Sequence, residues 1–485
     1  MSDHDLCCGK RCPARFSRRE FLGTMGAAGA SALALQAGLL SFAASAFGAD
    51  APTPPAGPRL RATFIRPRED KFWMGWPGAA YDLAGHQKLY TETLQKAAAR
   101  HGARLEFAVD PIYDAAGLAA FLESCQKDPP DGVILTIMHL DRWGDVDAFC
   151  AKRGAIPTVV FSPMGTSFTG HLQPTRTAKN VFVAATQDVD ALDLGVKLQK
   201  AVWQMKNTRI VIAAGDKAED KTLEILGTGL RYVPRARFPE ELAKVQASEE
   251  AKALAAFYRK EARKIVEPSE ADVLNAAKNY VACRNLMKAE NAQAVSMDCL
   301  GLVGSRQIPC PPCIAYSHLL DEGVAGVCEA DVGAALSHLV TLYVCDRPGF
   351  QQDPAPNTVN NTLMGAHCTC ATKLDGFDKP HEPIILRSHS ESNIGVSPQV
   401  LWRLGQKVTV MKCEGPGAML LGTGRVLANI DTPPSGGCRT SVEIEVDDVA
   451  DSRSVKGFHQ LFIYGDQSLK LKAFAALAGV NVVHI

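Results

Sequence analysis

Four residues of metal-ligating type stand in the last third of the chain. Glu329 lies in GVCEADVGAAL, Asp353 in GFQQDP, His367 in MGAHC and His459 in KGFHQLF. Two carboxylates and one or two imidazoles form a shell suited to Mn²⁺, or to Co²⁺ or Mg²⁺ as related divalent cations. Because these residues are far apart along the chain, they can share one ion only if tertiary folding brings them together.

Each of these residues also has an ordinary structural interpretation. Glu329 fits a helix cap beside Asp331, and Asp353 before a proline fits a turn. His367, between alanine and cysteine, has the surroundings of an interior histidine. Considered one at a time, the residues therefore leave the metal site and the structural roles both open.

The bulk composition bounds the class of protein. A chain of 485 residues is too long for one ordinary core, so two or three domains are expected. Its 46% hydrophobic and 21% charged residues are typical of a soluble globular protein. The formal net charge is zero and no basic tract is present, so we do not expect a nucleic-acid partner.

The N-terminus carries an export pattern. A twin-arginine motif is present at Ser17-Arg18-Arg19-Glu20-Phe21-Leu22. A Gly/Ala/Leu-rich stretch follows it, up to an A-x-A cleavage site at Ala44-Ser45-Ala46. We predict a signal peptide over residues 1–49, a Pro-rich linker over 50–58, and a periplasmic or other extracytoplasmic location. The alternative is an N-terminal membrane anchor. No later apolar run is long enough to span a membrane, so no stable span is expected after cleavage.

The fifteen cysteines have two interpretations. Disulfides are common in exported chains, but a twin-arginine substrate generally folds in the reducing cytoplasm before export. Cys310-Pro311-Pro312-Cys313 and Cys368-Thr369-Cys370 are either two local pairs or the halves of a split zinc site.

The order of apolar patterns predicts three folded domains. Short apolar runs alternate with helical runs over residues 59–175 and again over 176–353, which is typical of parallel-sheet α/β domains. Strand-like runs separated by Gly, Pro and Asp dominate residues 354–485, which predicts a β-rich, antiparallel, barrel-like domain. No GxGxxG lies between a strand and a helix, so a nicotinamide cofactor is not expected.

Several short sequence motifs resemble those of the L-fucose isomerase / L-arabinose isomerase superfamily, most clearly from Asp298 to Ile485. Ile65-Arg66-Pro67 is similar to an early motif of the fucose branch. That branch also places its two metal carboxylates near each other in the sequence, one at the head of a helix and one after it, and Glu329 and Asp353 fit this arrangement. Met138-His139, Gly365-Ala366-His367 and the late segment from Gly457-Phe458-His459 resemble the arabinose branch.

This resemblance implies a metal-dependent sugar isomerase. Glu329, Asp353 and His459 would bind Mn²⁺, His367 would be a fourth ligand or a substrate contact, and the two carboxylates would also move the proton. The family implies a homo-oligomer, a trimer or hexamer, in which the N-terminal domain completes a neighbour's pocket. The chemistry is consistent with this, since aldose–ketose interconversion passes through an ene-diolate that a divalent cation stabilises.

Three further residues are candidate substrate contacts. Arg66 would hold a sugar hydroxyl, or else pair with Glu69 or Asp70. His139 would reach a neighbouring subunit, or else be a histidine at a strand end, and His389 would contact the substrate beside a Gly-containing turn. The alternatives to isomerisation are another metal-dependent enolisation, such as epimerisation, and a non-catalytic exported carbohydrate-binding protein.

Overall fold

The computed structural model describes residues 57–73, 80–414, 417–431 and 437–485, which belong to one unit of the chain, Pro55–Ile485. The predicted signal peptide and residues 50–56 of the linker lie outside the described residues. Within these ranges, no helix combines the length and the apolar character that a membrane span requires.

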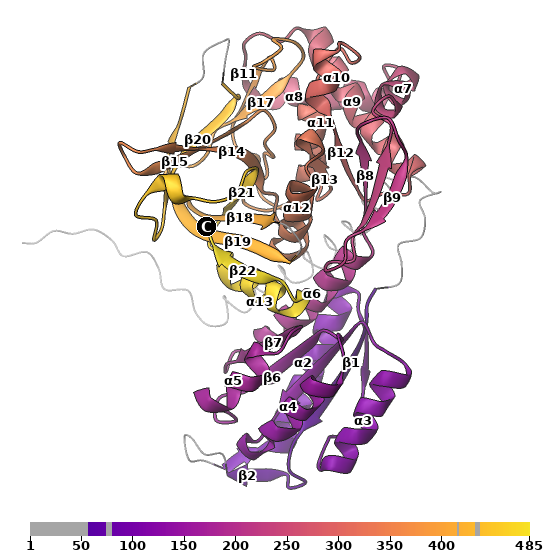
Figure 1. Ribbon diagram of the computed structural model, residues 1–485, viewed down its shortest axis with the longest axis vertical. Coiled ribbons are helices and arrows are strands. Elements are labelled where there is room, and N and C mark those ends of the chain that lie inside the picture. Colours follow the sequence, from indigo (N-terminus) through magenta and orange to yellow (C-terminus); the bar gives the residue numbers. More distant parts are fainter. Residues whose placement is uncertain (1–56, 74–79, 415–416, 432–436) are drawn as a thin grey trace, which may run out of the picture. The chain divides into compact units, whose positions relative to one another are not determined.

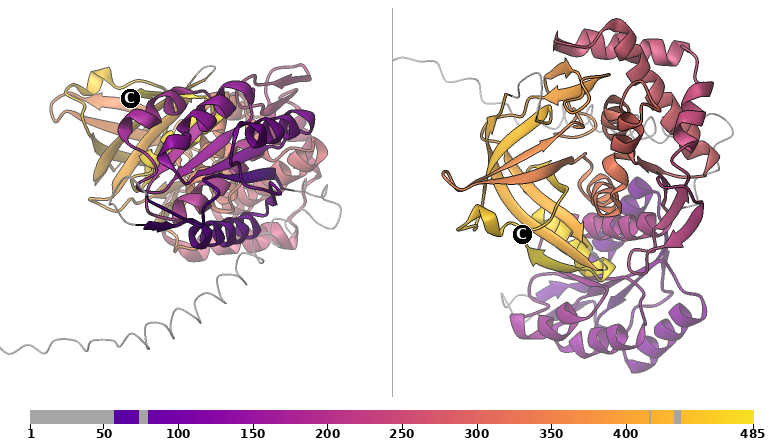
Figure 2. Two further views of the ribbon diagram at one scale, coloured as in Figure 1. Left: turned by 90° about the horizontal axis from the view of Figure 1, so that it is seen from below. Right: turned by 45° about the horizontal axis from the view of Figure 1, so that its top comes forward.

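The first sheet is wholly parallel, in the order β4-β1-β5-β6-β7. Helices cover both of its faces: α2 and α6 pack over one, while α3 and α4 pack over the other (Figure 2). All six residues of β5 are buried, as expected for a central strand covered on both sides. The elements of this sheet are β1 (Arg59–Ile65), α2 (Leu83–His101), β4 (Arg104–Phe107), α3 (Ala115–Lys127), β5 (Gly132–Ile137), η1 (Leu140–Arg142), α4 (Trp143–Lys152), β6 (Thr158–Ser162), α5 (Thr169–Thr177), β7 (Val181–Ala185) and α6 (Asp190–Lys206), with a small hairpin of β2 (Lys71–Trp73) and β3 (Ala80–Asp82).

Strand β7 belongs to this first sheet, although its sequence lies within the predicted second domain. It pairs with β6 from Thr158 opposite Val181 to Ser162 opposite Ala185. A strand followed by a helix gives the same pattern inside one sheet and between two sheets. The position of a boundary between two α/β domains therefore cannot be read from periodicity.

The second sheet has the order β13-β12-β8-β10-β9 (Figure 1). Its pairs are parallel except that β9 runs antiparallel to β10. The elements of this part are β8 (Arg209–Ala213), β9 (Glu219–Thr222), β10 (Gly229–Val233), α7 (Arg237–Lys244), α8 (Glu249–Glu261), α9 (Glu270–Ala289), β12 (Ala294–Met297), α10 (Cys299–Gly304), α11 (Cys313–Asp321), β13 (Ala325–Val327), η2 (Cys328–Ala330) and α12 (Val332–Cys345).

The C-terminal part is an antiparallel barrel, which confirms the predicted fold class. Six strands follow one another in the order β18-β21-β14-β15-β20-β19, and the pairing of β18 with β19 closes the ring. Strand β22 adds to β19 in parallel. The bounds are β14 (Phe350–Asn357), β15 (Thr362–His367), β18 (Lys407–Glu414), β19 (Ala418–Asn429), β20 (Thr440–Val446), η3 (Ser452–Ser454), β21 (Gln460–Tyr464), α13 (Ser468–Ala478) and β22 (Asn481–His484); β11 (Ala262–Ile265), β16 (Ile384–Arg387) and β17 (Ser397–Val400) form a separate small sheet.

Strand β14 is a barrel strand despite its two prolines. Its first half, Phe350–Gln352, pairs with β21, and its second half, Asp353–Asn357, pairs with β15. Pro354 and Pro356 thus fall where the strand has a neighbour on one side only, so their missing N–H groups break no second ladder. Asp353, predicted at the end of the second α/β domain, therefore lies within the barrel sheet.

Candidate metal centre

Glu329 stands on a strained turn between β13 and α12. Glu329 and Ala330 have φ of 65° and 54°, a left-handed backbone that costs non-glycine residues about 1–2 kcal/mol each. Asp331 ends the turn by capping α12, where its Oδ1 accepts the Ala334 amide at 2.7 Å. The turn places the Glu329 carboxylate just beyond the carboxyl end of a parallel strand, which is the usual place for a functional group in such a sheet.

The barrel ladder brings the other three residues together. Asp353 lies on β14 opposite Ala366, so it is next to His367 at the end of β15. On the other side of β14, Gln352 pairs with Gln460, and His459 directly precedes this residue. His459 also has a positive φ, 54°, which interrupts the regular alternation of side chains before β21 begins.

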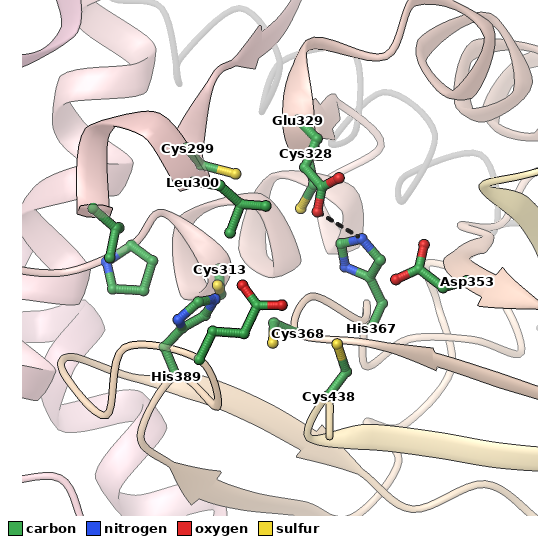
Figure 3. A pocket seen from close by; sticks show the side chains of 13 residues that line it. Cys299, Leu300, Cys313, Cys328, Glu329, Asp353, His367, Cys368, His389 and Cys438 are labelled. Carbon is green, nitrogen blue, oxygen red and sulfur yellow. Dashed lines mark ion pairs between the residues drawn. The ribbon is translucent and has the colours of Figure 1, made fainter. Parts of the chain in front are cut away.

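The four side chains meet in one cluster. Nε2 of His459 lies 3.2 Å from Oδ1 of Asp353 and 3.3 Å from Oε2 of Glu329. Nε2 of His367 lies 3.5 Å from Oε1 of Glu329, the contact drawn in Figure 3. One ligand atom from each of Glu329, His367 and His459 lies within 4.8 Å of the others, which makes these three a candidate metal-binding triad.

Buried atoms of this cluster make no hydrogen bond. Nε2 of both histidines and Oδ1 of Asp353 are buried, and none of them has a hydrogen-bond partner. Buried polar atoms without partners are uncommon in native proteins and call for an explanation. A divalent cation bound by the imidazole nitrogens and carboxylate oxygens would explain why these atoms have no hydrogen-bond partner. The residues present therefore fit the implied ion.

His459 is held by residues outside the triad. Its Nδ1 donates to Oδ2 of Asp331 at 2.8 Å, and the same oxygen accepts the Lys412 ammonium at 3.0 Å. A carboxylate on one ring nitrogen fixes the tautomer and turns the other nitrogen towards a metal. This arrangement leaves Nε2 of His459 as the ligand atom.

The electrostatics of the cluster favour a cation. The contacts of Glu329 with His367 and His459 hold the pKa of its carboxyl well below the ordinary value. Burial alone would lower the pKa of His459, but Asp331, Asp353 and Glu329 outweigh it and raise the pKa to about 11. Three carboxylates thus surround the Lys412 ammonium and the protonated His459, and a divalent ion that displaces the His459 proton would be held by the same negative charges.

Burial separates the imidazoles from the carboxylates. The side chains of His367 and His459 are each 4% exposed, whereas those of Glu329 and Asp353 are 28% and 40% exposed. The histidines therefore form the floor of the centre. The carboxylates border a pocket that opens beside it (Figure 3).

The predicted substrate contacts fall in two places. His389 lines the pocket, where its Nδ1 bonds the Ser392 hydroxyl at 2.9 Å and its ring contacts Cys368. Arg66 and His139 stand instead at the carboxyl ends of β1 and β5 in the first sheet, and neither lines this pocket. Their contribution to a neighbouring subunit stays a prediction.

Arg66 has the pairing that its alternative interpretation predicts. Its guanidinium donates to the carbonyls of Pro67 and Glu69 and to Oε1 of Gln87, and it lies 3.6 Å from Asp70. Nδ1 of His139 accepts the Asp141 amide at 3.2 Å at the start of η1.

Thiols surround the pocket, but they form no zinc site within the described ranges. Five line it: Cys299, Cys313, Cys328, Cys368 and Cys438 (Figure 3). Cys310 and Cys370, the outer members of the two Cys pairs, do not. In the part of the chain that the structure describes, the group of Glu329, His367 and His459 is the one set of three or more potential ligands, so the two Cys pairs do not converge on a shared metal.

Sequence reasoning missed three residues that support the centre. Asp331 was considered only as the neighbour of a cap, and Lys412 was not considered at all. Gln351 accepts the Cys328 amide at 3.4 Å and so supports the Glu329 turn. An aspartate directly before an apolar helical run signals a helix cap, but no local pattern signals a partner 128 residues away.

Comparison with known proteins gives one partial similarity. No family model matches the chain. It is 29% identical over 218 residues to a protein named sulfoquinovose isomerase from Clostridium sp. (strain MSTE9). The match covers 41% of this chain and 47% of the relative, so the chain spans about half the length of that protein. The similarity is to a sugar isomerase and does not single out the fucose or arabinose branch.

Proposed function

We propose that this protein is a metal-dependent sugar isomerase that interconverts an aldose and a ketose. The observation that carries the proposal is the convergence of Glu329, Asp353, His367 and His459 through contacts of 3.2–3.5 Å, in which Nε2 of both histidines and Oδ1 of Asp353 are buried and without hydrogen bonds. The partial similarity to a named sugar isomerase supports the same class of reaction.

The carboxylates of Glu329 and Asp353 are suited to acid–base work. Isomerisation removes a proton from the carbon beside a carbonyl and returns a proton to the neighbouring carbon. Both carboxylates lie within 3.3 Å of one atom, Nε2 of His459, and both are partly exposed at the pocket. We assign to them the two proton transfers, one acting as the base and the other as the acid.

A bound divalent cation would supply Lewis-acid stabilisation of the negative charge that develops on the substrate oxygens. The chain's own residues supply the rest of the site. His367 and His459 form a floor closed to solvent, and Asp331 and Lys412 keep His459 in its orientation. We propose Mn²⁺ as the ion, with Co²⁺ and Mg²⁺ as the other ions to be compared.

Deuterium exchange tests the reaction class. The protein would be incubated with Mn²⁺ and a panel of aldoses in D₂O, and the products would be analysed by NMR. Ketose formation with deuterium at C2 of the recovered aldose supports isomerisation. Exchange without ketose would favour epimerisation or another enolisation, and the absence of both would contradict the proposal.

Two isosteric variants distinguish catalysis from simple sugar binding. Glu329→Gln should remove turnover and weaken Mn²⁺ binding, because an amide oxygen is a poorer ligand and no base. Glu391→Gln changes another glutamate of the same pocket, outside the cluster, and should keep Mn²⁺ binding. Sugar binding that survives both EDTA and Glu329→Gln, with no turnover in the wild type, would identify a carbohydrate-binding protein instead.

A further inference from the structure

Two thiols meet where the chain leaves the barrel beside the proposed metal centre. Cys368 directly follows His367 at the end of β15, and Cys438 stands two residues before β20. These strands are paired with His367 opposite Thr440, so the segments beyond the ladder stay close together. The two side chains lie side by side at the edge of the pocket that both of them line (Figure 3).

The two sulfurs differ in how far reagents can reach them. Cys438 is partly exposed, whereas the other eleven cysteines of the described ranges are buried. Cys368 is buried but lines the pocket, where the Ser390 hydroxyl lies 3.3 Å from its sulfur. Exchange reactions of thiols depend on access as well as on chemistry. Cys438 is therefore the point of entry, and Cys368 is the thiol placed to react next.

A second pair of thiols gives an internal comparison. Cys299 and Cys328 also line the pocket and also lie beside each other. Both of them are buried, so this pair has contact without the access that Cys438 provides.

We propose that Cys368 and Cys438 form a reversible dithiol–disulfide site that exchanges with disulfide-bearing oxidants such as glutathione disulfide. Cys438 first attacks the oxidant, forms a mixed disulfide and releases one oxidant thiol. Cys368 then attacks the Cys438 sulfur and expels the second oxidant thiol. In total the two protein thiols lose two electrons and two protons, and the disulfide of the oxidant becomes two thiols.

The site also bears on the metal centre, and this part rests on the proposed function. A covalent bond between the two sulfurs ties the residue next to His367 to the segment that leads into β20. We expect the oxidised protein to bind Mn²⁺ several-fold differently from the reduced protein, because the position of a ligand depends on this backbone.

Disulfide mapping tests the exchange without any assay of activity. The full chain would be equilibrated with glutathione disulfide, the remaining thiols alkylated and the digest analysed by mass spectrometry. A linked Cys368–Cys438 peptide that dithiothreitol removes is the expected result. Cys438→Ser and Cys368→Ser should each abolish the link, while Cys299→Ser should keep it, and thermal unfolding shows that each variant is folded.

Other patterns would overturn the proposal. These are the absence of a link in the wild type, a mixed disulfide at Cys438 that does not pass on to Cys368, and a link between Cys299 and Cys328 instead. Mn²⁺ titration of the oxidised and reduced forms tests the second part. Equal affinities would overturn the connection to the centre while leaving the disulfide, whereas no Mn²⁺ binding in either form would count against the proposed function.

Discussion

Replacing Asp331 with asparagine should weaken Mn²⁺ binding although Asp331 is not in the ligand cluster. In the wild type its Oδ2 accepts two charge-assisted hydrogen bonds, from Nδ1 of His459 at 2.8 Å and from Lys412 at 3.0 Å. An asparagine amide placed there would donate towards the imidazole. His459 would then carry its proton on Nε2, the atom that the metal requires.

The expected magnitude follows from what asparagine can replace. If its oxygen turns to His459, the imidazole keeps its tautomer but the cap on Ala334 is lost, at a cost of about 1 kcal/mol. If its oxygen keeps the cap, the tautomer is wrong. Loss of such a supporting partner typically lowers metal affinity about 10- to 100-fold, which corresponds to about 1.4–2.7 kcal/mol.

The assay is isothermal titration of Mn²⁺ into the metal-free protein, with thermal unfolding as the check on folding. Asp114→Asn is the matched control, because Asp114 also caps a helix, at Gly117, and also pairs with a cation, Arg68, but touches no imidazole. An Asp331→Asn variant that binds Mn²⁺ as tightly as the Asp114→Asn variant would refute the argument that Asp331 orients His459.

Three further predictions concern stability, pH and the ion itself. In Gly365→Ala, the new Cβ would lie 2.5 Å from the Phe462 ring, so the free energy of unfolding measured with denaturant should fall by about 1–3 kcal/mol. The control Gly144→Ala changes an open helical position and should not lower the stability of the protein. Because the pKa of metal-free His459 is raised to about 11, Mn²⁺ must displace its proton, so affinity should rise about tenfold per pH unit between pH 6 and 8; an unchanged affinity in that range would contradict this. Saturation with Mn²⁺ at about 100 times Kd should stabilise the wild type by about 2.7 kcal/mol in thermal or denaturant unfolding and leave Glu329→Gln much less affected.

Much of the α/β fold follows from local pattern. The alternation of short apolar runs with helical runs over residues 59–353 predicted the parallel-sheet part, because buried parallel strands have short apolar runs and amphipathic helices have a clear period. The strand-like runs of residues 354–485 likewise predicted the β-rich, barrel-like part. The closure of the barrel by β18 and β19 and the membership of β7 in the first sheet are pairings between strands, which no local window contains.

The three barrel segments that carry the clustered residues have weak local strand signals. Two prolines disguise β14, a glycine interrupts β15, and β21 is a short run after an irregular segment. The four clustered residues were singled out by their chemical types and by the short sequence motifs around them. Their partners were not, since the bond between Asp331 and His459 joins positions 128 residues apart.

The unequal support of the four clustered side chains has a consequence for ion selectivity. Asp353 and His367 lie on hydrogen-bonded strands of a closed ring, and His459 directly precedes a third such strand, so the spacing of these segments cannot change without breaking the ladders. Glu329 projects from a three-residue turn outside that ring. This turn is therefore the part of the centre that can move to fit ions of smaller or larger radius. Substitutions at residues 328–330 should change the preferred ion more readily than substitutions in the barrel strands.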